Sequence, residues 1–133
     1  MTTQELLLRT KRAKRAMALA DTGTKNRALL AMADALLDNT KAILTANGLD
    51  LIEAKGAVST VMLDRLALSE ARIQGMAQGV REVAALPDPV GQVLTRRKRP
   101  NGLVIDKTAV PMGVIAIIYE SRPNVTSDAA ALA

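Results

Sequence analysis

The stretch VPMGVIAIIYESRPNVT occupies residues 110–126. Its central run, residues 114–119, is apolar and rich in β-branched side chains, and it does not alternate with polar residues. Such a run is typical of a β-strand covered by helices on both faces. A polar turn follows at residues 120–124, and residues 125–133 have the composition of a helix start. A strand, a polar turn and a helix in this order open a doubly wound α/β domain, so the sequence predicts an α/β fold.

A strand buried on both faces needs neighbouring strands and covering helices. The other residues supply few of these elements, and the sequence stops at Leu132-Ala133 inside an apolar helix. We therefore expect the chain to be the amino-terminal part of a longer cytoplasmic α/β enzyme. In a self-contained alternative, residues 114–119 pair with a hairpin just upstream of them, although apolar surface would then stay exposed.

The composition excludes several kinds of chemistry within these 133 residues. About half of the residues are apolar, which is enough for a core, but Tyr119 is the sole aromatic residue. The core must therefore consist of Ala, Leu, Ile, Val and Met. Cysteine and histidine are both absent, which excludes disulfides, a thiolate nucleophile and a Ser-His-Asp triad in this chain. Without these ligands we expect no transition-metal site.

The positive charge is clustered. The net charge is +5, with basic residues gathered at positions 9–15 and 96–99. We interpret both clusters as solvated faces, and a basic nucleic-acid-binding module is an alternative. Single-strand binding normally uses several aromatic stacking platforms, whereas docking of a helix in a major groove stays open. The amino-terminal residues do not have the pattern of a signal peptide, so a reducing intracellular setting is expected.

Helical periodicity dominates the first half of the sequence. A first helix is expected over residues 4–20, and Thr24 is a candidate N-cap for a long second helix that ends at Asn47-Gly48. A short helix over residues 49–55 should end at Gly56. Ser59 and Ser69 are expected to cap two further helices, which reach Leu66 and the Pro87-Asp88-Pro89 break. The expected buried face of the last of these helices consists of Ile73, Met76, Val80 and Val83.

A β-hairpin is expected next. Residues 92–99 and 103–109 are extended candidates, and Pro100-Asn101-Gly102 separates them. The Asn-Gly pair favours a two-residue type I′ turn. That turn would place Arg97 opposite Asp106, which is a favourable cross-strand pair, and Arg96 opposite Lys107, which is unfavourable.

The polar turn after the apolar run holds the best candidate site residues. The sequence contains neither of the common glycine-rich phosphate loops. Ligands of open α/β sheets bind at the carboxyl ends of strands, where this turn lies. Arg122 can bind a carboxylate or a phosphate in a fork, or it can form a structural ion pair. Asn124 can aim an amide N–H at a developing oxyanion, or it can be a plain N-cap.

The quoted stretch closely resembles the signature segment of the gamma-glutamyl phosphate reductase family, also called glutamate-5-semialdehyde dehydrogenases. The segment from Tyr119 to Asn124 is specific, and the resemblance covers essentially the whole chain. Further similar stretches are LDRLAL at 63–68, RIQGMA at 72–77, ALPDPVG at 85–91 and RPNGL at 99–103.

This resemblance implies an aldehyde dehydrogenase-like α/β protein with a cofactor domain, a catalytic domain and a small oligomerisation sheet. It implies NADPH-dependent reduction of L-glutamate 5-phosphate to L-glutamate 5-semialdehyde in proline biosynthesis, through a cysteine that would lie beyond this chain. The fragment alone would then lack activity. An inactive assembly module is the alternative.

The resemblance also suggests roles and domain boundaries. Asn124 would be the oxyanion donor, Arg122 would face the substrate, and Tyr119, Glu120 and Ser121 would line the site of NADP. Residues 1–90 would be the helical part of the cofactor-binding domain, residues 91–109 a hairpin arm of the oligomerisation sheet, and residues 110–133 the first strand, turn and helix of the dinucleotide-binding core. The longest apolar run, residues 114–119, is far shorter than the roughly 20 residues that span a bilayer, so we expect no membrane insertion, as we expect no metal. The resemblance implies no nucleic-acid partner and a homo-oligomeric full-length protein.

Overall fold

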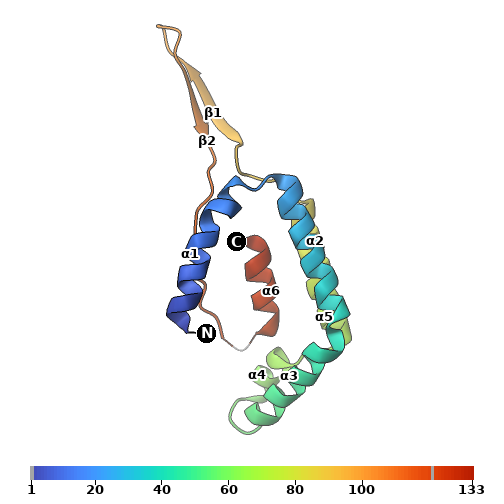
Figure 1. Ribbon diagram of the computed structural model, residues 1–133. Coiled ribbons are helices and arrows are strands. Elements are labelled where there is room, and N and C mark those ends of the chain that lie inside the picture. The colour runs from blue at the N-terminus through green and yellow to red at the C-terminus, as the bar shows by residue number, and fades with distance from the viewer. Residues whose placement is uncertain (1, 121) are drawn as a thin grey trace. The chain divides into compact units, whose positions relative to one another are not determined.

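The computed structural model describes residues 2–120 and 122–133, which form mainly helices and one two-stranded sheet (Figure 1). The expected helical region and the expected β-hairpin are both confirmed. In chain order the elements are α1 (Thr3–Leu19), α2 (Thr22–Asp38), α3 (Thr40–Ala54), α4 (Thr60–Leu66), α5 (Glu70–Ala85), β1 (Val93–Lys98), β2 (Val104–Thr108) and α6 (Pro123–Leu132).

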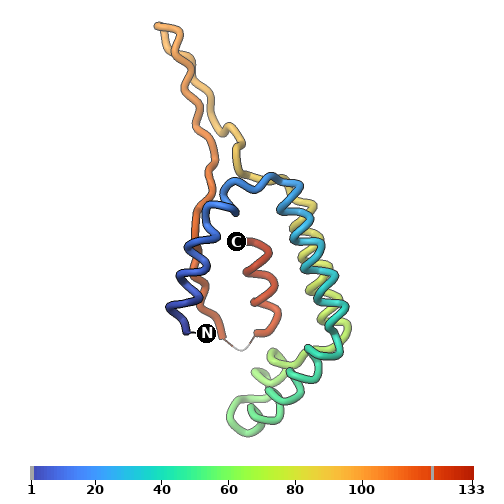
Figure 2. Tube along the Cα trace, in the orientation of Figure 1, coloured from blue at the N-terminus to red at the C-terminus, as the bar shows by residue number. Residues whose placement is uncertain are grey.

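The chain divides into two compact units. The first unit contains residues 1–22 and 87–115, and therefore α1 and the hairpin. The second unit contains residues 23–86 and 116–133, and therefore nearly all of α2 together with α3 to α6. Both units are discontinuous in sequence, as the colours of the chain trace show (Figure 2). No helix in the described part of the chain is long and apolar enough to cross a membrane.

Helix α1 of the first unit begins with a capping box. The Glu5 N–H donates to Thr2 Oγ1 (3.2 Å), and the Thr2 N–H donates to Glu5 Oε2 (2.7 Å). This reciprocal pair satisfies two of the donors that a helix start leaves free. Farther along α1, Lys14 lies against Gly113, which has a φ of 95°. A Cβ at Gly113 would come within 3.2 Å of Lys14 Cε, so glycine allows this close approach.

The hairpin forms, but the expected register is wrong by one residue. Arg96 pairs with Asp106 and Arg97 with Ile105, instead of Arg97 with Asp106. The turn has three residues, because Arg99 and Leu103 still pair through a 2.8 Å backbone hydrogen bond. Gly102 takes the left-handed conformation, with a φ of 87°, which is typical of three-residue hairpin turns. The extra turn residue shifts the cross-strand pairs of Thr95, Arg96, Arg97 and Lys98 by one position.

The observed register resolves the unfavourable charge pair that the expected one contained. The Arg96 guanidinium donates twice to the Asp106 carboxylate, from Nε and from Nη2, each over 2.7 Å. This hydrogen bond lowers the pKa of Asp106 below its ordinary value and raises the pKa of Arg96. Lys107 lies opposite Thr95, away from any basic cross-strand partner. The register therefore follows both turn chemistry and charge.

The apolar run at residues 114–119 does not form the expected strand. Within the described residues, positions 109–120 have no regular secondary structure, and the sheet contains β1 and β2 alone. The alternative small sheet, in which this run pairs with the hairpin, does not form either. A strand needs a neighbour for its backbone hydrogen bonds, and this run has none among the described residues. Its side chains are correspondingly exposed, to 98% for Ile118.

The core of the second unit is built from small aliphatic residues, as the composition requires. Ala33 of α2 and Ala77 and Val80 of α5 are fully or almost fully buried. Ala131 of α6 packs against them, together with Leu29, Met32, Leu36 and Leu37 of α2. The expected face of α5 is thus partly confirmed. Ile73 and Val80 are buried, whereas Met76 and Val83 lie at its margin.

The long second helix of the prediction is two helices in the structure. Helix α2 begins at Thr22, so Thr24 lies inside it and is not an N-cap. The helix ends at Asp38, and α3 begins at Thr40. Thr40 Oγ1 donates to the carbonyl of Leu37 (2.7 Å), and Asn39 has a φ of −100° and a ψ of 13°. A hydroxyl that bonds the preceding turn competes with the helical backbone and accompanies this break.

Asn47-Gly48 does not end a helix, contrary to expectation. Both residues lie inside α3, which also takes in the separate short helix expected after them, and Asn47 is 95% buried. Its side-chain Nδ2 donates to the Leu66 carbonyl (2.9 Å), and its Oδ1 accepts from the Leu68 N–H (2.8 Å). Asn47 therefore acts at long range, as a link to the α4–α5 connection. Local sequence preference does not reveal this tertiary role.

The other expected helix boundaries are confirmed. Gly56 follows α3 with a φ of 85°. The hydroxyl of Ser59 accepts from the Met62 N–H at the start of α4, and that of Ser69 accepts from the Arg72 N–H (3.2 Å) at the start of α5. These boundaries depend on one residue and its nearest turn, which is why sequence alone identifies them.

We predict that Asn47→Ala lowers the free energy of unfolding by about 2–4 kcal/mol. The substitution leaves the Leu66 carbonyl and the Leu68 N–H without their partner, and an unsatisfied buried polar group costs roughly 1–3 kcal/mol. Urea denaturation of the purified protein measures the change. Asp50→Ala, at an exposed site on the same helix, should change the value by less than about 0.5 kcal/mol. Equal losses for both variants would contradict the assigned role.

We further predict that Asp106 titrates below the usual carboxyl pKa of about 3.9. A depressed folded-state pKa means that the Arg96–Asp106 pair stabilises the hairpin above the unfolded pKa and loses its effect as pH falls through the folded one. Carbon NMR of the Asp106 carboxyl measures the midpoint. Arg96→Gln should return it to the ordinary range. Arg97→Gln, which removes the same charge opposite Ile105, should leave it low.

Candidate functional site

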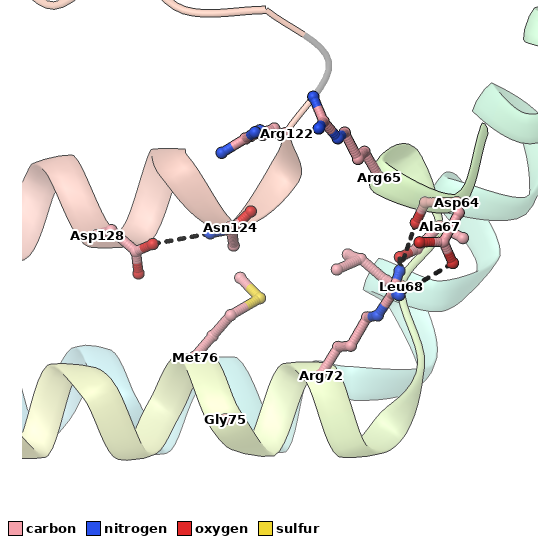
Figure 3. A pocket seen from close by; sticks show the side chains of 10 residues that line it. All are labelled: Asp64, Arg65, Ala67, Leu68, Arg72, Gly75, Met76, Arg122, Asn124 and Asp128. Carbon is pink, nitrogen blue, oxygen red and sulfur yellow. Dashed lines mark hydrogen bonds and ion pairs between the residues drawn. The ribbon is translucent and has the colours of Figure 1, made fainter. Parts of the chain in front are cut away.

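A pocket of about 420 Å³ lies in the second unit, between the end of α4, the first half of α5 and the start of α6 (Figure 3). Its volume suits a small-molecule ligand. The residues that line it come from two stretches of sequence that are more than 40 positions apart. They are Asp64, Arg65, Ala67, Leu68, Arg72, Gly75, Met76, Arg122, Asn124 and Asp128.

Polar side chains hold one wall of the pocket, the α4–α5 connection. Arg72 donates through Nη1 to the carbonyls of Asp64 and Ala67, and through Nη2 to the Asp64 carboxylate (3.1 Å). Asn47 forms hydrogen bonds with the backbone of Leu66 and Leu68. These bonds fix the stretch of backbone that carries Asp64, Arg65, Ala67 and Leu68.

The opposite wall is the first turn of α6. Arg122 is the N-cap residue, Pro123 is the first helical residue, and Asn124 is the second. Proline suits this position because its missing N–H would have no partner there. The buried Ser127 donates from Oγ to the Asn124 carbonyl (2.8 Å). Asn124 Nδ2 donates to Asp128 Oδ2 (2.9 Å). Because Arg122 occupies the N-cap position, the hypothesis that Asn124 is an N-cap is wrong.

This geometry constrains the amide of Asn124. A primary amide has two N–H donors, and the bond to Asp128 engages one of them. The side chain is half-buried and lines the pocket, which leaves a second N–H for a ligand. Asn124 is therefore an oriented donor at the edge of a cavity.

The charges in the pocket are unbalanced. Three arginines and two aspartates line it, which leaves an excess of one positive charge. Asp64 is engaged by Arg72 in an ion pair. Among the residues that the structure describes, the side chains of Arg65 and Arg122 make neither a hydrogen bond nor an ion pair. The pocket is thus suited to an anionic ligand.

Tyr119 and Glu120, two of the three residues expected at the cofactor site, are not among the residues that line this pocket. Tyr119 is exposed, and its hydroxyl is 2.6 Å from Thr126 Oγ1, where either oxygen can donate. Glu120 is also exposed. Ser121 lies outside the described residues. The structure thus brings together Arg122 and Asn124 of the expected site residues and leaves Tyr119 and Glu120 at the surface next to α6.

Sequence reasoning missed that α4, α5 and the connection between them contribute to the pocket. Arg65 and Asp64 look like ordinary charged residues of a short helix, and Arg72 looks like part of a solvated face. Their spacing in the sequence carries no catalytic pattern. The similarity of residues 63–68 and 72–77 to the reductase family is the one signal that sets these stretches apart.

Comparison with known proteins supports that resemblance. No protein-family model matches the chain. The chain is 58% identical over 129 residues to the gamma-glutamyl phosphate reductase of Streptococcus pneumoniae. The matched residues make up 97% of this chain and 31% of that protein. The chain thus spans about a third of the length of the curated relatives that it matches. The resemblance to the amino-terminal portion of gamma-glutamyl phosphate reductase is confirmed.

Solved structures of enzymes with the same name have the same fold. The gamma-glutamyl phosphate reductase of Thermotoga maritima matches 92% of this chain and 30% of its own, with 40% identity and a TM-score of 0.89. That of Saccharomyces cerevisiae matches 99% of this chain and 34% of its own, with 32% identity and a TM-score of 0.90. The helices and the hairpin are therefore shared with these structures.

We predict that Asp128→Ala releases the side-chain amide of Asn124. Removal of the carboxylate leaves Asn124 Nδ2 without the acceptor that orients it. The hydrogen exchange of this amide, followed by nitrogen-edited NMR, should become faster by several fold. Asp38→Ala, which removes an exposed carboxylate from α2, serves as the control. An unchanged exchange rate in Asp128→Ala would show that another contact fixes the amide.

Proposed function

We propose that the protein to which this chain belongs reduces L-glutamate 5-phosphate to L-glutamate 5-semialdehyde with NADPH, as a step of proline biosynthesis. The observation that carries the proposal is that Arg122 and Asn124 line one pocket, in a chain 58% identical to gamma-glutamyl phosphate reductase over 97% of its length. Arg122 supplies a cation for an anionic substrate, and Asn124 supplies an N–H donor for an acyl oxygen.

The reaction places clear demands on the protein. The acyl carbon gains a hydride, the bond between that carbon and the phosphate oxygen breaks, and phosphate leaves. Negative charge develops on the acyl oxygen before the aldehyde forms. A fixed N–H donor stabilises that charge because it needs no reorganisation when the charge appears. The oriented amide of Asn124 has this property, since Asp128 holds its other N–H.

Arg122 contributes binding. Both the carboxylates and the phosphate of L-glutamate 5-phosphate are anionic at neutral pH. A guanidinium presents paired donors that match either group. The Arg122 side chain is exposed and has no partner among the described residues, so its donors are available to a substrate.

A nicotinamide cofactor supplies the hydride when it is bound. Two described residues suit the margin of its site. The exposed ring of Tyr119 offers an apolar face to a planar group, and the exposed Glu120 offers an acceptor for a hydroxyl. Ser121 completes this proposed set. NADP as the specific cofactor is part of the proposal.

We assign domains on the same basis. Residues 1–90 would belong to the cofactor-binding domain, residues 91–109 to an oligomerisation sheet of a cytoplasmic homo-oligomer, and residues 110–133 to the start of the dinucleotide-binding core. The exposed apolar run at residues 114–119 supports the last assignment, because such a run gains stability when strands pair with it on both sides. The nucleophilic cysteine would lie elsewhere in the protein, so this chain alone would not complete the reaction.

We predict that Asn124→Ala in the full-length protein lowers kcat by about 100-fold or more, as loss of an oxyanion donor does. The assay is the reverse reaction, phosphate-dependent reduction of NADP+ by glutamate 5-semialdehyde. Thermal unfolding of the same variant checks that the fold is retained.

The control is Asn39→Ala, which removes the same side chain from an exposed position between α2 and α3. It should retain the activity of the unaltered protein. A full-length protein with no phosphate-dependent activity would refute the proposed reaction. A fully active Asn124→Ala variant would refute the role of Asn124 and leave the reaction intact.

A further inference from the structure

We infer that Arg65 and Arg122 together bind a phosphoryl group in the pocket between α4, α5 and α6. The identity of the compound that carries this phosphoryl group rests on the proposed function. Neither the family resemblance nor the similar proteins assign a role to Arg65. The assignment comes from its placement beside Arg122, across a fold that brings the two residues together from distant parts of the sequence.

The first argument is the absence of a counter-charge. Arg65 and Arg122 line the same cavity, and neither side chain is paired among the described residues. Asp64, the carboxylate next to Arg65 in sequence, is occupied by Arg72. Two unpaired like charges at one cavity repel each other, and a bound anion relieves the repulsion. Among the described residues, the protein supplies neither arginine with a partner that would offset this repulsion.

The second argument is the position of Arg122. It is the N-cap residue of the ten-residue helix α6, and its side chain makes no capping hydrogen bond. Ser, Thr, Asp and Asn are the preferred residues there. A cation at a helix start is unfavourable, because that end of the helix carries partial positive charge. Arginine at this position is unfavourable by itself. An anion that contacts both the Arg122 guanidinium and the helix start makes both interactions favourable.

The third argument is the direction of Arg65. Its side chain extends from α4 toward the start of α6, where Arg122 lies (Figure 3). Asp128, the other acidic residue of the pocket, lies in this view on the opposite side of Arg122 from Arg65, where it accepts a hydrogen bond from Asn124 Nδ2. The region between Arg65 and the α6 start is therefore the most positive part of the pocket.

A phosphoryl group fits this region better than a carboxylate does. Two guanidinium groups and a helix start together favour a doubly charged, tetrahedral anion whose oxygens point in several directions. A carboxylate offers two oxygens in one plane, which one arginine can satisfy by itself. The phosphoryl group could belong to the acyl phosphate or to the cofactor, and both sources give the same local chemistry.

Direct binding tests the inference without any turnover. Inorganic phosphate is titrated into the full-length protein while the Nε signals of its arginines are followed by NMR. The signals of Arg65 and Arg122 should shift together and saturate. Arg65→Gln should weaken phosphate binding by about 10- to 100-fold, the range for loss of a charge-assisted hydrogen bond. Arg65→Lys, which keeps the charge and loses the fork, should bind with intermediate affinity.

Kinetics identifies the source of the phosphoryl group. In the reverse reaction, a rise of KM for phosphate in Arg65→Gln, with KM for NADP+ unchanged, assigns the group to the acyl phosphate. A rise of KM for NADP+ alone assigns it to the cofactor. Lys41→Gln removes one positive charge from an exposed site on α3 of the same unit and should change neither constant.

The two proposals can fail separately. Phosphate binding that depends on Arg65, in a protein without reductase activity, supports the anion site and refutes the proposed reaction. Normal activity in Arg65→Gln, with both KM values and the phosphate affinity within about two-fold of the unaltered protein, overturns the anion site and leaves the reaction standing. Thermal unfolding of each variant confirms that the comparison is made between folded proteins.

Discussion

The connection between α4 and α5 is held by two side chains, and the pocket depends on it. Asn47 bonds the backbone of Leu66 and Leu68, and Arg72 bonds the backbone of Asp64 and Ala67. A short connection of this kind has backbone groups that no helix satisfies, so it keeps one conformation only where other groups supply partners. The bonds that fix the connection also fix the backbone that carries Arg65.

The core imposes a second constraint. With no Phe or Trp in the sequence, α2, α5 and α6 pack through alanine and valine. Small side chains let helices approach closely. Within α6, the buried Ser127 donates from Oγ to the Asn124 carbonyl and so stabilises the first turn of that helix. Arg122 and Asn124 are therefore positioned by helix packing. The exposed apolar run before them has no partner strand among the described residues.

The amino-acid sequence predicts those features that depend on one residue and its nearest turn. The Ser59 and Ser69 caps and the Gly56 terminus are identified because capping is local. Asn47 is misinterpreted because its partners lie about 20 residues away. The hairpin is found with the wrong register, because the Asn-Gly pair fits both a two-residue and a three-residue turn. The strand expected over residues 114–119 does not form, because a strand is a property of a pair of segments and composition describes only one of them.

The same distinction between local and long-range features applies to the residues of the candidate site. Arg122 and Asn124 stand together in one polar turn, and the chemistry of their side chains by itself indicates a site. Arg65 has no such local signal, because an arginine on a short helix is most simply a solvated residue. Its significance appears when the fold sets it opposite a second unpaired arginine at a helix start. A cation at the N-cap is unfavourable in isolation, and so is a second cation beside it. A bound anion would offset both unfavourable interactions. The two arginines together therefore indicate an anion site more strongly than either arginine alone.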